Sequence, residues 1–366
     1  MEAASPTPRP IRVALPMVTL VPGMMGGSET YVEELATRLP QQPDVDVVVS
    51  VPRGAPIWAG DRTLVSSRVS VTRSSLGRLT NQARTELDTD ARSPFRTADV
   101  VHYPLTVPSP RPRRGVPWVQ TLLDTQHHDL RSNFSRSELI YRRWRYDEPA
   151  RRATAVITIS EFCKERITTH LGIPADRIHV AHLGVDTTEF VPNRGPRDRF
   201  VLYPARGWPH KNHRVLLEAM AVVRRDHPDL RLVLTGGGLD DLGPLPPWVD
   251  VRGLVSRADL LDLYRRAACL AFPSTYEGFG LPPLEAMASG CPVAAASAGS
   301  LPEVCGDAAA LFDPHDSASV ARGIAEALDR SDELAARGLE RVTGFSWERC
   351  VRTHVDVYRE VVARRK

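Results

Sequence analysis

Residues 269–296 read CLAFPSTYEGFGLPPLEAMASGCPVAAA, and the order of residue types in this stretch decides the fold class. A short apolar run at 269–272 precedes a glycine-containing loop, and a helix-like segment then leads to a second apolar run at 292–296. Short apolar runs that alternate with amphipathic segments predict βα units around a parallel sheet. We therefore expect this stretch to form one strand–helix–strand unit of a doubly wound α/β fold.

The same alternation continues on both sides of this unit. Between 53 and 96 the chain is too polar and irregular for a pattern to be assigned. The expected strands are 11–15, 45–51, 99–103, 118–122, 155–159, 200–204, 230–235, 249–252, 269–272 and 292–296, and the expected helices are 30–39, 135–153, 211–225, 257–267 and 282–289.

Two domains are expected in a chain of 366 residues with 42% hydrophobic content. The segment 184–199 is rich in glycine, proline and polar residues, and a new strand follows it. This pattern indicates a boundary between an N-terminal domain, 1–190, and a second domain that starts at 191. Open α/β sheets bind ligands at the carboxyl ends of their strands, so two facing sheets place the site in the cleft between them.

Composition excludes several function classes. The formal net charge is +3 with acidic and basic residues interspersed, which argues against a nucleic-acid partner; the local basic excess lies at 111–114 and 142–152. The five cysteines form no CxxC pair, so neither a zinc site nor a disulfide framework is indicated. A polar start and the lack of any apolar stretch near 18 residues favour a cytoplasmic protein without a membrane span, although peripheral contact with a membrane stays open.

The loop in the deciding stretch has the features of an anion site. Gly278 and Gly280 allow the backbone to approach a ligand closely, and Pro282 suits the first turn of a helix. The amides of Phe279, Gly280 and Leu281, with the positive end of the helix, would hold a diphosphate or a sugar beside it.

Two carboxylates flank this anion site. Glu277 falls in the loop and Glu285 falls about one turn into the helix, so they can contact different parts of one extended ligand. That division suits a nucleotide sugar, which carries hydroxyls at both ends. The alternative is that Glu277 is a solvated loop residue and Glu285 a charge on the helix surface.

A pair of cations precedes them in the sequence. Residues 205–212, ARGWPHKN, join the first strand of the second domain to its first helix. Arg206 can make a bidentate contact and Lys211 can act as a mobile point charge, so both can converge on one diphosphate.

The Glu-x7-Glu pattern within EGFGLPPLEAMA resembles the signature of glycosyltransferase family 4. The resemblance implies the GT-B fold, with two Rossmann-like domains facing across a cleft, and a retaining transfer. It implies that Glu277 approaches the donor sugar hydroxyls, that Glu285 binds the ribose hydroxyls, and that Arg206 and Lys211 bind the phosphates. The segment 191–345 would be the donor domain, and 346–366, with Trp347 and a final helix, resembles the segment that crosses back to the N-terminal domain.

Three further segments match the family more weakly. Gly26 and Gly27, within 23–30, resemble the glycines that let the N-terminal domain approach donor phosphates or acceptor. Gly236 in TGGG (235–238) and Leu254 in RGLV (252–255) resemble positions that border base and ribose, although a glycine after a strand is often only a tight turn. No residue near them selects the base, so UDP, GDP and dTDP sugars all stay open.

Residues 121–129, TLLDTQHHD, resemble the HDxQH segment of mannosyl- and rhamnosyltransferase-like members, with one departure. Leu123 stands where the family has a histidine near the reacting sugar. Either His127 or His128 substitutes for it, or the donor is a deoxysugar that lacks the contacted hydroxyl. The alternative is that both histidines only pack or cap.

The basic helix that follows carries Arg142, Arg143 and Arg145. These arginines suit contact with an anionic acceptor or with membrane headgroups, or else form a solvated helix face.

The expected function is the metal-independent transfer of a hexose or deoxyhexose from a nucleotide diphosphate sugar to a sugar, aglycone or glycan, without a further cofactor. No carboxylate pair stands at a strand end of the second domain to hold a metal, and Arg206 with Lys211 can replace one. His127 is the candidate on the acceptor side. The alternatives are a catalytically silent nucleotide-sugar-binding protein and a sugar-nucleotide epimerase of similar architecture; the absence of GxGxxG weakens a dehydrogenase. The sequence leaves the oligomeric state open.

Overall fold

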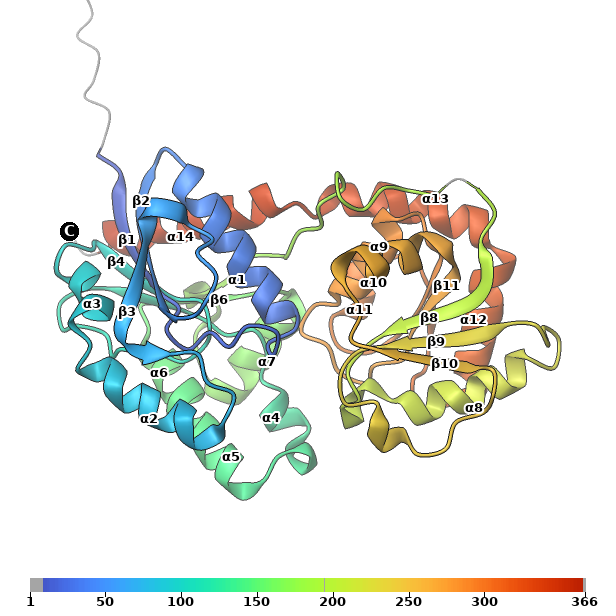
Figure 1. Ribbon diagram of the computed structural model, residues 1–366. Coiled ribbons are helices and arrows are strands. Elements are labelled where there is room, and N and C mark those ends of the chain that lie inside the picture. Colours follow the sequence, from blue (N-terminus) through green and yellow to red (C-terminus); the bar gives the residue numbers. More distant parts are fainter. Residues whose placement is uncertain (1–8, 194, 365–366) are drawn as a thin grey trace, which may run out of the picture. The chain divides into compact units, whose positions relative to one another are not determined.

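The computed structural model describes residues 9–193 and 195–364 (Figure 1). The chain forms two compact units. The first comprises the N-terminal residues to Ile159, the segment Cys163–Ala181 and the C-terminal segment from Glu348; the second comprises Ser160–Phe162 and His182–Trp347.

The first unit is built on a seven-stranded parallel sheet in the order β3-β2-β1-β4-β5-β6-β7. All five strands expected in this half are confirmed. The unassigned region supplies β3, an edge strand in which only two of eight residues are buried, so it has no apolar run to reveal it. The strands are β1 (Ile11–Pro16), β2 (Val45–Arg53), β3 (Thr63–Ser70), β4 (Val100–Tyr103), β5 (Trp118–Thr121), β6 (Ala155–Thr158) and β7 (Ile178–Val180).

Helices alternate with the strands of this sheet along the chain, together with short 3-10 turns. The helices are α1 (Gly27–Arg38), α2 (Ser75–Glu86), α3 (Thr89–Arg92), α4 (Gln126–Asp129), α5 (Arg136–Arg142), α6 (Glu148–Arg152), α7 (Glu161–Leu171) and α14 (Trp347–Ala363), and the 3-10 turns are η1 (Leu39–Gln41), η2 (Gly60–Arg62), η3 (Ser93–Arg96), η4 (Arg131–Asn133) and η6 (Ala175–Arg177).

The single helix expected at 135–153 is interrupted. It begins with a capping box between Ser135 and Glu138, continues as α5, and passes through a π-helical turn, η5 (Arg143–Asp147), into α6. Pro149 has no N–H to donate to the carbonyl of Arg145, so the regular ladder cannot run through this point. The π turn leaves both Arg145 and Asp147 buried.

A buried chain of hydrogen bonds fixes α14 to the first sheet. The His354 imidazole bonds the Tyr31 hydroxyl through Nε2 at 2.8 Å, and that hydroxyl contacts Thr121 Oγ1 at 2.9 Å. Thr121 Oγ1 also contacts His102 Nε2 at 2.8 Å, and His102 Nδ1 contacts the Tyr358 hydroxyl at 2.7 Å. The final helix therefore belongs to the first unit through polar side chains as well as apolar packing.

The direction of this chain follows from one backbone contact. His354 Nδ1 lies 2.8 Å from the carbonyl oxygen of Cys350, which only accepts, so Nδ1 carries the proton and Nε2 accepts from Tyr31. It follows that Thr121 Oγ1 donates to the Tyr31 hydroxyl and His102 Nε2 donates to Thr121 Oγ1. The Tyr358 hydroxyl then donates to His102 Nδ1. Burial lowers the pKa of His354 to about 4, so its imidazole stays neutral.

The second unit repeats the architecture with a six-stranded parallel sheet in the order β10-β9-β8-β11-β12-β13. The five strands and three helices expected here are confirmed. The strands are β8 (Asp198–Pro204), β9 (Arg231–Thr235), β10 (Val249–Gly253), β11 (Ala267–Phe272), β12 (Val293–Ala296) and β13 (Ala310–Phe312). The helices are α8 (His213–Val223), α9 (Arg257–Arg266), α10 (Leu281–Ala288), α11 (Leu301–Cys305), α12 (Ser317–Asp329) and α13 (Ser331–Arg341), and the 3-10 turns are η7 (Pro209–Lys211), η8 (Asp240–Leu242) and η9 (Val342–Gly344).

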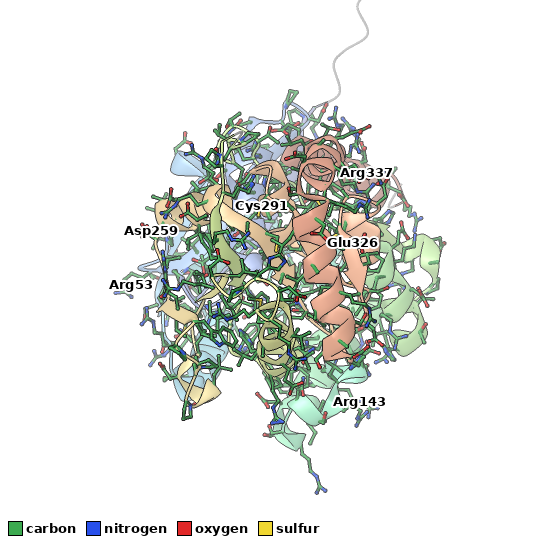
Figure 2. The ribbon with its side chains drawn as sticks, turned by 90° about the vertical axis from the view of Figure 1, so that its right-hand side faces the viewer. Arg53, Arg143, Asp259, Cys291, Glu326 and Arg337 are labelled. Carbon is green, nitrogen blue, oxygen red and sulfur yellow. The ribbon has the colours of Figure 1, made fainter. Side chains whose placement is uncertain are left out.

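Both sheets have the doubly wound order in which the chain reverses direction beside the first strand. The fold is therefore two Rossmann-like α/β units, as expected. Cys291 lies in the interior of the second unit, whereas Glu326 and Arg337 stand on its helices (Figure 2), and all five cysteines are free and buried. Within the described residues, no helix is both long enough and apolar enough to cross a membrane.

Candidate functional site

Two loops of the second unit bring Lys211 and Glu277 together. One loop follows β8 and the other follows β11, and these strands are neighbours at the point where the strand order reverses. Lys211 Nζ lies 2.5 Å from Glu277 Oε1, and the two side chains are only 14% and 13% exposed. The two residues predicted for phosphate and sugar therefore form one largely buried ion pair at the carboxyl edge of the sheet.

Backbone contacts hold these two loops in register. The amide of Thr275 donates to the carbonyl of His210 at 2.8 Å, and the Tyr203 hydroxyl donates to the carbonyl of Lys211 at 2.6 Å. Asn212, in the left-handed conformation with φ 60°, donates from its side chain to the carbonyl of Pro273 at 3.2 Å. The positions of Lys211 and Glu277 are thus set by the scaffold as well as by their own attraction.

Glu285 is a buried carboxylate and not a surface charge. Its side chain accepts from the Tyr264 hydroxyl at 2.8 Å and from Arg257 Nη1 at 3.2 Å, and the residue is 8% exposed. Arg257 also pairs with Glu189 at 2.6 Å. Burial, and then the charge of Glu285, raises the pKa of Tyr264 well above its usual value, so Tyr264 stays a hydrogen-bond donor.

The start of α10 has the features predicted for an anion site. Gly280 is its N-cap residue with φ 106°, and no side chain caps the helix. A Cβ at Gly280 would lie 2.7 Å from Leu301 Cδ2, so the position needs glycine for both its φ and its packing. The side chain of Phe279 is buried and its carbonyl accepts from Ser300 Oγ at 2.7 Å, while the carbonyl of Gly278 accepts from Ser160 Oγ at 2.7 Å. Leu281, at the first helical position, is 9% exposed.

The glycines after β9 allow a close approach to the loop that carries Arg206. Gly236 has φ 135°, and a Cβ there would overlap the backbone of Ala205. Next to it, the amide of Gly207 donates to the carbonyl of Gly237 at 3.0 Å. A Cβ on Gly237 would lie 3.8 Å from both Arg206 Nη1 and Leu254 Cδ2, so these predicted residues surround one point. Gly236 is therefore needed for packing against Ala205, whether or not it also borders a ligand.

In the first unit, the predicted glycines lie where β1 leads into α1. Gly26 is the N-cap of α1 with φ 55°, and Gly27 is its first residue. Both are exposed, and a Cβ on Gly26 would meet nothing within 4 Å. The Glu29 carboxylate accepts from the amide of Gly23 at 2.8 Å and closes this loop.

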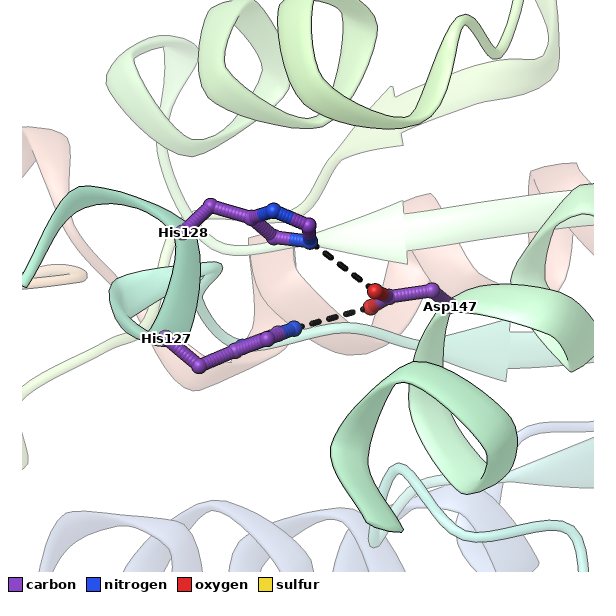
Figure 3. A group of neighbouring side chains, drawn as sticks. All are labelled: His127, His128 and Asp147. Atoms are coloured by element: carbon purple, nitrogen blue, oxygen red, sulfur yellow. Dashed lines mark hydrogen bonds and ion pairs between the residues drawn. The ribbon is translucent and has the colours of Figure 1, made fainter. Parts of the chain in front are cut away.

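His127 and His128 are held by one carboxylate from the π turn. His127 Nε2 and His128 Nε2 lie 2.9 Å from Oδ1 and Oδ2 of Asp147, respectively (Figure 3). His127 is 3% exposed and Asp147 is fully buried. The structure therefore gives His127 a packed, hydrogen-bonded position, and Nδ1 of its ring is buried without a hydrogen-bond partner among the described residues.

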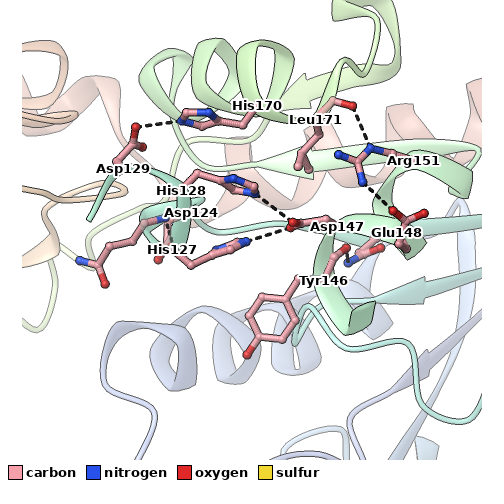
Figure 4. Close-up of polar contacts among 12 residues, drawn as sticks. Asp124, His127, His128, Asp129, Tyr146, Asp147, Glu148, Arg151, His170 and Leu171 are labelled. Atoms are coloured by element: carbon pink, nitrogen blue, oxygen red, sulfur yellow. Dashed lines mark hydrogen bonds and ion pairs between the residues drawn. The ribbon is translucent and has the colours of Figure 1, made fainter. Parts of the chain in front are cut away.

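These three side chains are also the group of His, Cys, Asp or Glu residues, within the described part of the chain, that fits a metal ion by geometry. Their donor atoms lie within 4.8 Å of one another, and two imidazoles with a carboxylate form a set that zinc accepts. The same atoms already satisfy one another by hydrogen bonds. Around them, the ring of His128 stacks on that of His170, which contacts Asp129 at 2.8 Å (Figure 4). Asp147 thus clamps α4 through both histidines, although His127 Nδ1 stays buried without a hydrogen-bond partner among the described residues.

The three arginines of the basic helix have different environments. Arg142 lies over the rings of Phe134 and Tyr146, with its guanidinium carbon 4.4 and 5.1 Å from the ring centroids. Arg143 is exposed, whereas Arg145 is 9% exposed. The sequence-based grouping of these arginines into one face does not hold, because the π turn separates them.

A cavity of about 620 Å³ opens beside the carboxyl ends of β1 and β4 in the first unit. The loop after β1 supplies apolar side chains that include Met24 and Met25. Helices α2 and α5 supply polar ones, among them Gln82, Tyr141 and Arg142, and Gln82 Nε2 donates to the Tyr141 hydroxyl at 2.5 Å. This wall suits a ligand with both an apolar surface and hydroxyl groups.

The side chains that fix Glu285 and the two histidines were not predicted from the sequence. Arg257 and Tyr264, both on α9, hold Glu285, and their seven-residue spacing is the only signal that they share a helix face. Asp147 holds both histidines, but nothing in the sequence indicated this. The regular helix expected at 135–153 did not predict that its side chain points toward them.

Two family models match consecutive parts of the chain. Residues 25–189 match the model described as Glycosyltransferase Family 4, and residues 185–340 match Glycosyl transferases group 1.

Curated relatives agree with these matches. The chain is 35% identical over 236 residues to O-antigen chain mannosyltransferase B of Escherichia coli, covering 57% of this chain and 61% of that protein. It is 33% identical over 233 residues to the MMP alpha-(1->4)-mannosyltransferase of Mycolicibacterium hassiacum, covering 59% and 56%. A D-inositol 3-phosphate glycosyltransferase of a Nocardioides species is 29% identical over 396 residues, covering 93% and 86%. The matches thus span about three fifths of the first two relatives.

Solved structures match over nearly the whole chain. Sucrose-phosphate synthase from Thermosynechococcus elongatus superposes with a TM-score of 0.73 at 21% identity, covering 96% of this chain and 99% of that one. HepE from Anabaena in complex with UDP and glucose gives 0.69 at 18% identity, covering 96% and 100%. At these identities the likeness shows a shared fold, namely two Rossmann-like units of the GT-B class.

Proposed function

Because this chain belongs to glycosyltransferase family 4 and has the GT-B fold, we propose that it transfers a hexose or deoxyhexose from a nucleotide diphosphate sugar to an acceptor with retention of anomeric configuration. The single observation that carries the proposal is the arrangement at the carboxyl edge of the second sheet. There a largely buried Lys211–Glu277 pair on two neighbouring loops lies beside α10, which has an uncapped start and carries the buried Glu285. HepE, which shares the fold, binds UDP-glucose.

The donor diphosphate is assigned to Lys211, Arg206 and the first amides of α10. In the absence of a ligand, Glu277 neutralises Lys211 at 2.5 Å. A bound diphosphate would compete for Lys211 and release Glu277 toward the sugar hydroxyls. Breaking the bond between the anomeric carbon and the phosphate oxygen builds negative charge on the leaving diphosphate, and a fixed cation there is worth roughly 3 kcal/mol of transition-state stabilisation.

Glu285 is assigned to the ribose. Tyr264 and Arg257 each occupy part of its carboxylate and hold it in one orientation. Because these two bonds fix the carboxylate, its remaining lone pairs can accept from two vicinal hydroxyls without a change of orientation on binding.

Retention follows from a same-face substitution in this proposal. The acceptor hydroxyl attacks the anomeric carbon on the face that the diphosphate leaves, and a departing phosphate oxygen takes the acceptor proton. Arg206 and Lys211 supply the positive charge that a metal ion supplies in other transferases, so we propose that the reaction needs no metal. Among the described residues, the metal-compatible group of three His or Asp side chains lies in the first unit, around Asp147.

The acceptor is assigned to the cavity of about 620 Å³ in the first unit. Its apolar wall with Met24 and Met25 suits a ring face or an aglycone, whereas Gln82 and Tyr141 can bond hydroxyls. We also propose that His127 acts on the acceptor side, since Leu123 stands at the usual histidine position. Asp147 holds the His127 ring in place.

Calorimetric titration with UDP, GDP and dTDP in the presence of EDTA tests the donor site. One diphosphate should bind, and Arg206→Ala/Lys211→Ala should abolish that binding while leaving affinity for the corresponding nucleoside within about twofold, because the nucleoside makes no phosphate contact. Equal loss of nucleoside affinity would contradict the phosphate assignment.

Leu123 gives a reason to test a second candidate, a nucleotide-sugar-binding protein without turnover. Incubation with donor and a panel of acceptors, followed by chromatography, separates the possibilities. A transferase forms a glycoside, whereas the silent protein forms none even as Leu123→His. A sugar-nucleotide epimerase would change the donor sugar with no acceptor present.

A further inference from the structure

Arg145 is a buried cation, and no ion pair to it is found among the residues that the structure describes. The residue is 9% exposed, and its Nε has no hydrogen-bond partner among the described residues. Its guanidinium carbon lies 5.6 Å from the ring centroid of the neighbouring Trp144, which is itself 61% exposed. Burying a charge without pairing it is unfavourable, so such a group points to a partner from outside the chain.

The surroundings of Arg145 are strongly basic. It lines a cavity of about 970 Å³ in the first unit, and the one acidic residue there, Glu148, already accepts from Arg151 at 2.9 Å. Clustered guanidinium groups in a concave site raise the positive potential inside it. The arginines that line the cavity are Arg111, Arg113, Arg114, Arg145, Arg152 and Arg364.

This cavity lies at the opposite edge of the sheet from the assigned acceptor site. Trp118 and Thr154 line it, and they stand at the amino ends of β5 and β6. The acceptor cavity, by contrast, is lined by residues such as Leu20 and Leu105 that follow the carboxyl ends of β1 and β4. The basic cavity is therefore a separate site within the same unit.

A solvated basic helix face is the simpler explanation, and Arg143 fits that description. It is exposed and lines neither cavity, and its side chain projects from the ribbon in Figure 2. Arg145 does not fit, because the π turn directs it inward, where water cannot surround it. The contrast between these two neighbours separates a ligand site from a wet surface.

We propose that the basic cavity is a second ligand site, which binds an anion carrying two or more phosphate groups. Arg145 forms the base of the site and offers a planar fork that matches phosphate oxygens, while Arg113 and Arg152 stand at its exposed wall. The phosphates come either from a soluble molecule or from the headgroups of an anionic membrane. The site does not depend on the proposed transferase activity.

Calorimetry with inorganic pyrophosphate tests this site. The full-length Arg206→Ala/Lys211→Ala protein serves as the parent, so that the assigned donor site does not contribute. Arg145→Gln should weaken pyrophosphate binding by about tenfold or more, whereas Arg143→Gln, the matched control, should change it by less than about twofold. Binding to the parent should also change the fluorescence of Trp144 and weaken as salt is raised.

Flotation with phosphatidylcholine vesicles, with and without phosphatidylglycerol, distinguishes the source of the phosphates. Arg145-dependent binding of pyrophosphate alone supports a soluble ligand, and Arg145-dependent binding to anionic vesicles supports a headgroup. The proposal is overturned if neither probe binds the parent, or if Arg143→Gln and Arg145→Gln weaken binding equally. If Arg145→Gln does not fold, Arg113→Gln/Arg152→Gln takes its place, with the same expected loss.

Discussion

The buried hydrogen-bond chain on α14 makes the stability of the first unit depend on pH. His354 is neutral in the folded protein, and burial lowers its pKa from 6.5 to about 4. In the unfolded chain it binds a proton near pH 6.5, so the unfolded state takes up more protons than the folded state between these values. Stability from this group is therefore fully present above pH 6.5 and is lost as the pH falls toward 4.

The size of the effect follows from the two pKa values. A difference of this size corresponds to about 3 kcal/mol in full, of which about 2 kcal/mol is lost by pH 5. Protonation of His354 at Nε2 would also oppose the Tyr31 hydroxyl, which donates to that nitrogen, and would require the whole chain to Tyr358 to reverse its direction. The transition should therefore involve the first unit as a whole.

Hydrogen exchange resolved by peptide, and corrected for intrinsic exchange rates, measures this loss separately in each unit. That separation matters because burial also lowers the pKa of His213, in the second unit, to about 4. In His354→Gln the drop in free energy of opening of the first unit between pH 7.5 and pH 5 should shrink by about 2 kcal/mol. The exposed His315→Gln should leave it unchanged. An unaltered drop in His354→Gln would refute the assignment of a neutral buried imidazole.

Two further predictions concern the assigned donor site. Glu277→Ala should reduce turnover by about a hundredfold with nucleotide affinity retained, whereas Glu285→Ala should first weaken nucleotide binding; steady-state kinetics beside calorimetry decide, and identical small effects of both would contradict their assigned roles. Gly207→Ala should reduce stability by about 1–3 kcal/mol and weaken nucleotide binding, because its Cβ would overlap the carbonyl of Gly238, whereas Gly344→Ala, which has open space, serves as the control in thermal unfolding. A Gly207→Ala protein as stable as the control would show that this contact can relax.

The central strands could be predicted because they are buried on both faces. Strands such as β11 can be recognised in the sequence alone, because they are continuous apolar runs. The edge strand β3 could not be found, since only Ser66 and Val69 are buried in it and its other six residues are partly or fully exposed. The doubly wound order followed from alternation of element types, which is a property of the chain alone.

The sequence predicted on which local elements the candidate residues lie, but not which contacts they make. The spacing within 273–290 located Glu277 and Glu285, since loop and helix N-terminus are local features. That Glu277 pairs with Lys211, and that Tyr264 holds Glu285, depends on how separate elements pack. The need for glycine at 236 could not be predicted either, because it comes from the nearby backbone of Ala205, a contact that no sequence pattern indicates.

The π turn between α5 and α6 is where the structure departs from the continuous helix expected at 135–153. At 3.6 residues per turn, Arg142 and Arg145 lie on one helix face and form one basic patch. The wider turn, which ends at Asp147, separates them, so that Arg142 stacks on aromatic rings at the acceptor cavity and Arg145 lines the basic cavity at the other edge of the sheet. A variant that removes both charges together would therefore combine two separate effects, and only single substitutions can assign a loss of transfer to one cavity and a loss of anion binding to the other.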